Sequence, residues 1–137
     1  MVLLQAPEEL KLQLKAIGTP VHCSAGEFLF RRGEAVKGIF LVLAGAVRLG
    51  LEEEPTAFPS RRIGPEAVLG LPATLSNSPY SLSAEVLEDA SFVYLSREGL
   101  LGLLRDQHQL CFQVMRILTD ELTETRVALE RVRKVGV

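Results

Sequence analysis

The chain has 137 residues, of which 47% are apolar and 23% are charged, a composition typical of one globular domain. The net charge of −2 and the pI of about 5.7 exclude an overall positive field that would draw the chain to nucleic acid. No apolar run approaches the about 20 residues that span a bilayer, and the N-terminus lacks the basic and apolar regions of a secretory signal. We therefore expect a cytoplasmic protein.

The first 20 residues are expected to carry a short N-terminal helix over residues 7–17. Pro7 and two glutamates form its first turn, and Gly18 and Pro20 end it. Three apolar residues recur at helical spacing on one face. They are Leu10, Leu14 and Ile17.

Residues 21–96 form a zone of short apolar runs, rich in branched and aromatic residues and separated by glycines. Glycine adopts turn angles that other residues reach only with strain. The expected strands are 21–24, 28–31, 38–44, 46–52, 60–63, 67–69, 81–86 and 90–96. This pattern predicts a mainly β fold with flanking helices, in which tightly turned strands form a β-roll that can enclose a pocket.

Two helices are expected after the β zone. Ser96 is a suitable N-cap for a short helix over 97–105, and a long helix then occupies most of 106–137. Its apolar seam alternates steps of three and four residues, as in a coiled coil. The seam runs through His108, Cys111, Met115, Leu118, Leu122, Thr125, Leu129 and Val132. A second stripe, Leu110, Val114 and Ile117, borders only the early part.

The N-terminal half of this helix carries two apolar stripes, and its C-terminal half carries only the seam. This pattern indicates a helix that first packs on its own roll and then faces a partner. We therefore expect a parallel homodimer with an interface that includes Cys111, Met115, Leu118, Leu122, Thr125, Leu129 and Val132. The alternative is a helix that folds back across its own roll.

The histidines and cysteines do not indicate a metal site. The chain has His22, Cys23, His108 and Cys111, without the CxxC or HxxxH-type spacing of zinc ligands. Without an export signal a disulfide is not expected either. Two histidines are too few for a metal enzyme of the cupin type, and no nucleophile–base pair is evident. We expect no metal, no cofactor and no catalysis.

The order of these elements resembles the cyclic-nucleotide-binding superfamily, specifically the sensor domain of catabolite-activator (Crp) and Fnr-type bacterial transcription regulators. The resemblance is most specific in Gly26-Glu27, in Gly33-Glu34 and in the strand 39–47 that closes on glycine. Residues 63–70 resemble the strand that leads into the phosphate-binding cassette, and 86–90 resemble the turn after it. The resemblance implies a β-roll of the jelly-roll type, an effector pocket and a long dimerising helix whose packing carries the signal.

The cassette departs from the family pattern. Cyclic-nucleotide binders carry Phe-Gly-Glu-Leu-Ala and, further on, an arginine followed by a small hydroxyl residue. Here Leu71 stands in the place of the ribose-binding glutamate, and Tyr80 in that of the phosphate-binding arginine. On the long helix, Ala128 and Leu129 replace polar residues that meet the base. The candidate pocket residues are Gly70, Leu71, Pro72, Ala73, Tyr80, Ser81, Leu82, Ser83, Ala128 and Leu129.

No lysine or arginine occurs between Ile63 and Ser96, so we expect a cavity with only neutral walls. A phosphate buried without a cation carries a penalty of several kcal/mol. Binding of cyclic AMP or cyclic GMP in the usual manner is therefore not expected. Three possibilities stay open: an uncharged metabolite, a nucleotide held by backbone amides near Gly70, or side chains that simply fill the roll.

Other sensory and DNA-binding functions of the family are not expected. Two cysteines cannot supply the four thiolates of an iron–sulfur cluster, and His22 and His108 are weak candidates for haem ligands. Family regulators continue into a winged helix-turn-helix. The sequence has none, and its basic cluster at 131–134 is small. We expect a sensor fragment of a longer regulator, or a stand-alone module, that does not bind DNA by itself.

Overall fold

The fold is seen in a computed structural model that describes residues 6–51, 60–120 and 122. Its described strands form one antiparallel sheet, with the order β1-β6-β3-β4, and β2 and β5 add to β6 and β3. The elements are α1 (Glu8–Ile17), β1 (Thr19–Cys23), β2 (Phe28–Phe30), β3 (Gly38–Gly50), β4 (Arg61–Ile63), β5 (Val68–Leu69), α2 (Leu71–Ser76), β6 (Ser83–Ser96) and α3 (Arg97–Asp106). A further helical segment begins at Gln109 and runs through residue 120.

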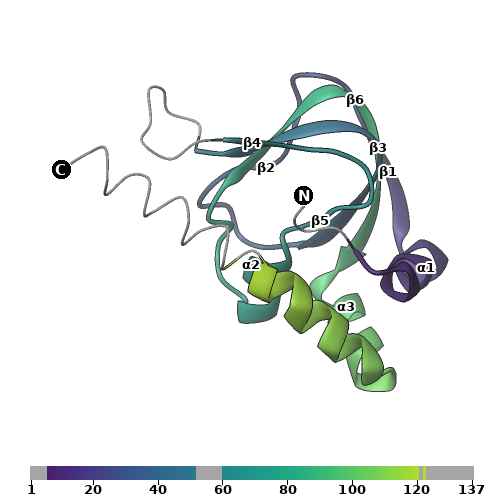
Figure 1. Cartoon of the computed structure of the whole chain (residues 1–137). Coiled ribbons are helices and arrows are strands. Elements are labelled where there is room, and N and C mark those ends of the chain that lie inside the picture. The colour runs from purple at the N-terminus through teal and green to yellow at the C-terminus, as the bar shows by residue number, and fades with distance from the viewer. Residues whose placement is uncertain (1–5, 52–59, 121, 123–137) are drawn as a thin grey trace.

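The sheet curls on itself into a roll, as Figure 1 shows, with α1 to the right and the other helices gathered below. The long strands β3 and β6 form its spine and pair from Gly38 and Ser96 at one end to Gly50 and Ser83 at the other. The predicted fold class, mainly β with flanking helices, is confirmed. No helix among the described residues is long and apolar enough to cross a membrane.

Two of the predicted turns are wrong, because β3 and β6 run straight through them. Gly45 was expected to separate two strands, yet it lies within β3, where the register with β6 shifts. Its φ of 91° and the position of a Cβ only 2.6 Å from the carbonyl oxygen of Asp89 explain the glycine. Residues 86–90, expected as a turn, belong to β6. The irregularities are β-bulges, which bend a strand without ending it.

Helix α2 was not predicted at all. It begins after Gly70, which has the left-handed φ of 86°, and it has a proline in its first turn. The carbonyl oxygen of Gly70 accepts hydrogen bonds from both the amide and the hydroxyl of Thr74, at 3.1 and 2.7 Å. Asn77, also left-handed, ends the helix.

The boundary between the last two helices also differs from the prediction. Helix α3 ends at Asp106, and Gln107 leaves the helical conformation with a φ of −130°. The next helix therefore starts at Gln109 and not at Asp106. The expected early stripe is confirmed as an internal contact, because Leu110, Val114 and Ile117 are buried in the core. The part of the long helix beyond residue 122 lies outside the described residues.

Candidate functional site

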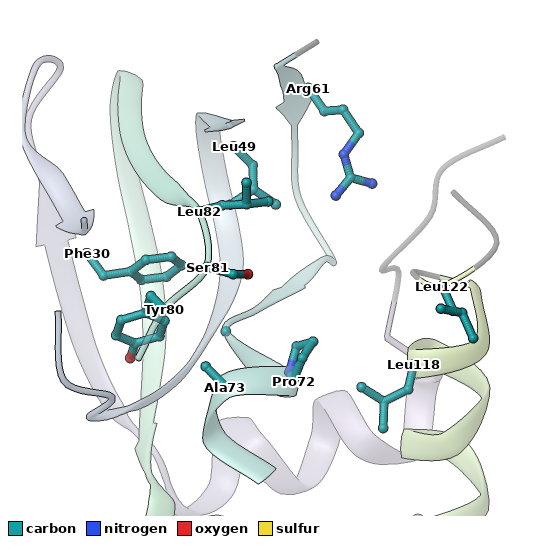
Figure 2. Close-up of a pocket in the computed structure, with 11 residues that line it drawn as sticks. Phe30, Leu49, Arg61, Pro72, Ala73, Tyr80, Ser81, Leu82, Leu118 and Leu122 are labelled. Carbon is teal, nitrogen blue, oxygen red and sulfur yellow. The ribbon is translucent and has the colours of Figure 1, made fainter. Parts of the chain in front are cut away.

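A cavity of about 420 Å³ lies between the roll, α2 and the last helix, as Figure 2 shows. It falls within the range of about 300–1,000 Å³ that is typical of small-molecule sites. Its walls are mostly apolar and come from segments far apart in the sequence. The lining residues are Phe30, Leu49, Arg61, Gly70, Pro72, Ala73, Tyr80, Ser81, Leu82, Leu118 and Leu122.

Gly70 is at the point where β5 turns into α2. A Cβ at this position would lie 3.1 Å from the carbonyl oxygen of Gly38 and 3.1 Å from the ring of Tyr80. Together with its positive φ, this crowding restricts the position to glycine. The glycine thus lets β3, the tyrosine ring and the start of α2 meet closely at one end of the cavity.

Tyr80 is locked in place at the same end. Its ring stacks on Phe30 with centroids 3.9 Å apart. Its hydroxyl donates to the carbonyl oxygen of Gly38 at 2.8 Å and accepts from the amides of Lys37 and Gly38. The side chain is 2% exposed. A hydroxyl engaged in this way is an anchor for β3 and has little capacity left for a ligand.

The expectation that the cavity has only neutral walls is wrong, because Arg61 lines it. It lies on β4, where it is paired with Leu49, and both residues line the cavity. Successive side chains of a strand point to opposite faces, so Arg61 shares a face with the buried Ile63, while Arg62 faces outward. Neutral walls were expected from the segment after Ile63 alone, which has no lysine or arginine, but Arg61 lies just before that segment.

The comparisons with known proteins agree with this architecture. Residues 20–107 match the family described as cyclic nucleotide-binding domain. The chain belongs to this family. The resemblance inferred from the sequence is thereby confirmed.

The relatives include regulators of transcription. The chain is 32% identical over 104 residues to the transcriptional activator protein Anr of Pseudomonas aeruginosa, a match that covers 72% of this chain and 41% of Anr. The Thermus thermophilus catabolite activator protein has a similar structure, with a TM-score of 0.76, 27% identity and coverage of 93% of this chain and 60% of that one. The sensor domain of DNR from Pseudomonas aeruginosa shares the fold, at 18% identity and a TM-score of 0.66, over 85% of this chain and 79% of that domain.

Within the described residues, no three histidine, cysteine, aspartate or glutamate side chains gather to hold a metal. Cys23 and Cys111 are unpaired and half-buried. Burial, followed by the charge of Glu27, raises the pKa of the Cys23 thiol above its usual value. A raised pKa lowers the fraction of the reactive thiolate form.

Six of the predicted pocket residues line the cavity: Gly70, Pro72, Ala73, Tyr80, Ser81 and Leu82. Leu71 does not, because α2 turns it into the core, where it is 1% exposed. Ser83 is also buried, and its hydroxyl accepts the amide of Arg32 at 2.9 Å. Ala128 and Leu129 lie outside the described residues.

The sequence reasoning missed five lining residues, namely Phe30, Leu49, Arg61, Leu118 and Leu122. The alternation of Arg61, Arg62 and Ile63 along one strand was a usable signal for the arginine.

The predicted dimer seam divides into parts with different surroundings. Met115 is 56% exposed. Leu122 is 70% exposed and also lines the cavity, and Leu118 packs against the core and lines the cavity. Cys111 is half-buried, and its thiol donates to the carbonyl oxygen of Leu104 at 3.8 Å. The remaining predicted interface residues, Thr125, Leu129 and Val132, lie outside the described residues.

Proposed function

We propose that this domain is the sensor of a Crp/Fnr-type transcription regulator, and that it binds a small effector in the cavity but does not hold cyclic AMP or cyclic GMP in the usual manner. One observation carries the proposal. The cavity is bounded both by the cassette, through Gly70 and Ala73, and by the last helix, through Leu118 and Leu122. A ligand in it would contact the element that the family resemblance assigns to signalling.

The cassette itself supports the exclusion of a normally bound cyclic nucleotide. Leu71 is buried in the core, and the hydroxyl of Tyr80 is engaged with β3. Arg61 and Tyr80 lie at opposite ends of the cavity in Figure 2. A phosphate placed against the cassette would therefore be desolvated without an adjacent cation, which is strongly unfavourable.

Transmission of the signal is proposed to run through a parallel homodimer of the last helices. Met115 and Leu122 are exposed and seven residues apart, so they lie on one face of the helix. Leu118 reaches the cavity from the neighbouring part of the helix. A ligand that presses on Leu118 would thus change how that face meets a partner.

The DNA-reading function of such a regulator is proposed to require residues beyond this sequence. The chain spans 41% of Anr and 60% of the Thermus catabolite activator protein. Its net charge of −2 does not favour DNA binding by the chain alone. A regulator of transcription acts where the DNA is, which places the proposed function in the cytoplasm.

Thermal unfolding in the presence of cyclic AMP, cyclic GMP and a metabolite panel tests the proposal. A ligand that binds only the folded state raises the midpoint, and a concentration of 100 times Kd contributes about 2.7 kcal/mol. We expect a saturable rise with a metabolite and none with either cyclic nucleotide. Ala73→Leu, which fills the cavity from α2, should abolish the rise, and Ala44→Leu on the exposed part of β3 should not.

Two outcomes would contradict the proposal in different ways. A saturable rise with a cyclic nucleotide, lost in Ala73→Leu, would show that the departures in the cassette do not prevent binding. No rise with any compound would show that the cavity does not serve as a receptor site.

A further inference from the structure

We propose that the ligand of the cavity is a small amphipathic monocarboxylate, with its apolar body among the leucines and its carboxylate on Arg61. This inference rests on the proposed function and specifies its ligand. It starts from the position of one charge. Arg61 is the one lysine or arginine among the described lining residues, and it is half-buried there.

The β3–β4 pair carries three arginines, and Arg61 differs from the other two in its surroundings. Arg48 and Arg62 are cross-strand neighbours on the outer face, and each forms an ion pair with a glutamate of β6. The partners are Glu85 for Arg48 and Glu88 for Arg62. Within the described residues Arg61 has no such carboxylate. The β3–β4 pair thus directs Arg48 and Arg62 to glutamates of β6 and Arg61 to the cavity.

The shape of the Arg61 guanidinium favours a carboxylate as the bound anion. Its fork of N–H donors matches a carboxylate with two parallel hydrogen bonds, and such pairs are among the strongest polar contacts in proteins. One cation balances one negative charge. A phosphate monoester near pH 7 carries close to two charges, so part of its charge would remain desolvated and unpaired in this cavity.

The other residues that line the cavity favour a ligand whose uncharged part is apolar. Leu49 is paired with Arg61 across β3 and β4, Leu82 lies beside Leu49 in Figure 2, and Leu118 lines the cavity from the helix. Ser81 offers a hydroxyl, but the hydroxyl of Tyr80 is already engaged. A sugar or nucleoside would leave several of its polar groups without partners, and each one costs affinity. An aliphatic or arylaliphatic chain carries no such groups.

Calorimetric titration with 4-phenylbutyrate, its neutral amide 4-phenylbutyramide, and phenyl phosphate tests the inference. We expect the carboxylate to bind the wild-type chain about 10- to 100-fold more tightly than the amide, the range set by one charge-assisted hydrogen bond. Phenyl phosphate should bind more weakly than the carboxylate. Comparing these compounds on the unaltered protein needs no variant to fold.

Matched variants then assign the preference to one side chain. Arg61→Gln should remove the advantage of the carboxylate over the amide, and Arg61→Lys should retain part of it because the charge remains. Arg62→Gln is the control, since it removes a neighbouring cation from the outer face of the same strand. It should leave the preference for the carboxylate unchanged.

The results separate this inference from the proposed function. Equal affinity for acid and amide, or an unchanged preference in Arg61→Gln, would overturn the assignment of the anion while the cavity remained a receptor site. Tighter binding of phenyl phosphate would overturn the choice of a carboxylate. Failure of all three compounds to bind would overturn the inference, whereas the proposed function would still be judged by the metabolite panel.

Discussion

Tyr80 is held in the fold by both its ring and its hydroxyl. Its ring covers Phe30, and its hydroxyl joins the start of β3 through Lys37 and Gly38. The neighbouring Gly70 leaves room for this ring only because it has no side chain. The tyrosine and the glycine therefore stabilise each other's positions at the closed end of the cavity.

Tyr80→Phe should lower the free energy of unfolding by about 1–3 kcal/mol, because the buried carbonyl oxygen of Gly38 loses a hydrogen bond donor. Tyr94→Phe is the control, since its hydroxyl donates to the carbonyl oxygen of Lys37 at 3.1 Å in an exposed hydrogen bond. Urea denaturation at equal protein concentration should show a smaller loss for Tyr94→Phe. Equal losses for the two variants would indicate that the Tyr80 hydroxyl has no special role.

The presence of Arg61 in the cavity could not be predicted from the cassette residues. The family resemblance identified which positions belong to the cassette, and six of the predicted pocket residues line the cavity. The arginine comes from a strand before the cassette, and only the closure of the roll brings it there. Its inward direction follows from alternation with Ile63, but which face of β4 meets the cavity depends on pairing with β3.

At the scale of elements, α1 is attached to the roll by a small polar cluster around Glu66. The Lys11 ammonium lies 2.8 Å from the carboxylate of Glu66 and 3.3 Å from that of Glu8. The backbone of Glu66, with a φ of 77°, accepts the amide of Ala6 and donates to the carbonyl oxygen of Val42. One strained residue thus joins the N-terminal segment, α1 and β3.

This cluster predicts a pH dependence of stability. The hydrogen bond to Glu66 raises the pKa of Lys11 above 10.5, so the folded state holds this proton more tightly than the unfolded state. The stabilisation is fully present below pH 10.5 and is lost as the pH rises through the higher folded-state pKa. The difference in unfolding free energy between wild type and Lys11→Met should therefore shrink above pH 10.5.

Urea denaturation of both proteins across the alkaline range measures that difference. The exposed Lys15 provides the control, because Lys15→Met should differ from wild type by the same small amount at each pH. A difference for Lys11→Met that did not change with pH would mean that the ion pair does not stabilise the fold.

The elements themselves could be predicted only in part. Apolar runs and glycines located the strands, but Gly45 was interpreted as a turn because a glycine at a bulge and one at a turn look alike in sequence. The close approach of Asp89 that requires this glycine is a tertiary contact. Helix α2 is too short for helical periodicity to be detected, although Pro72 near its start was a usable signal.

At the scale of the whole molecule, the last helix presents apolar side chains to both the cavity and the solvent. Ile117 is buried, whereas Phe112, Met115 and Leu122 are 74%, 56% and 70% exposed. Such a concentration of exposed apolar residues on one helix is typical of an interaction surface. It supports the proposed dimer and links that dimer to the cavity through Leu118.

Met115→Glu combined with Leu122→Glu should convert the proposed dimer into a monomer, because two charges on each helix would face their copies across the interface. Light scattering measures the mass, and far-UV circular dichroism checks that the roll remains folded. Leu12→Glu, at a 58% exposed position on α1, is the control and should leave the dimer intact. A dimeric mass in the double variant, or a monomeric wild type, would rule out this interface.

Methyl NMR during a titration with 4-phenylbutyrate tests the proposed carboxylate site most directly, because it locates the bound ligand. The chain has a second, smaller cavity of about 230 Å³, which lies beside Lys11 and Lys15 and is lined by Leu41 and Leu43. We expect the methyl signals of Leu82 and Leu118 to shift together and saturate, while those of Leu41 and Leu43 stay in place. Shifts confined to Leu41 and Leu43, or none at Leu118, would contradict the proposed site.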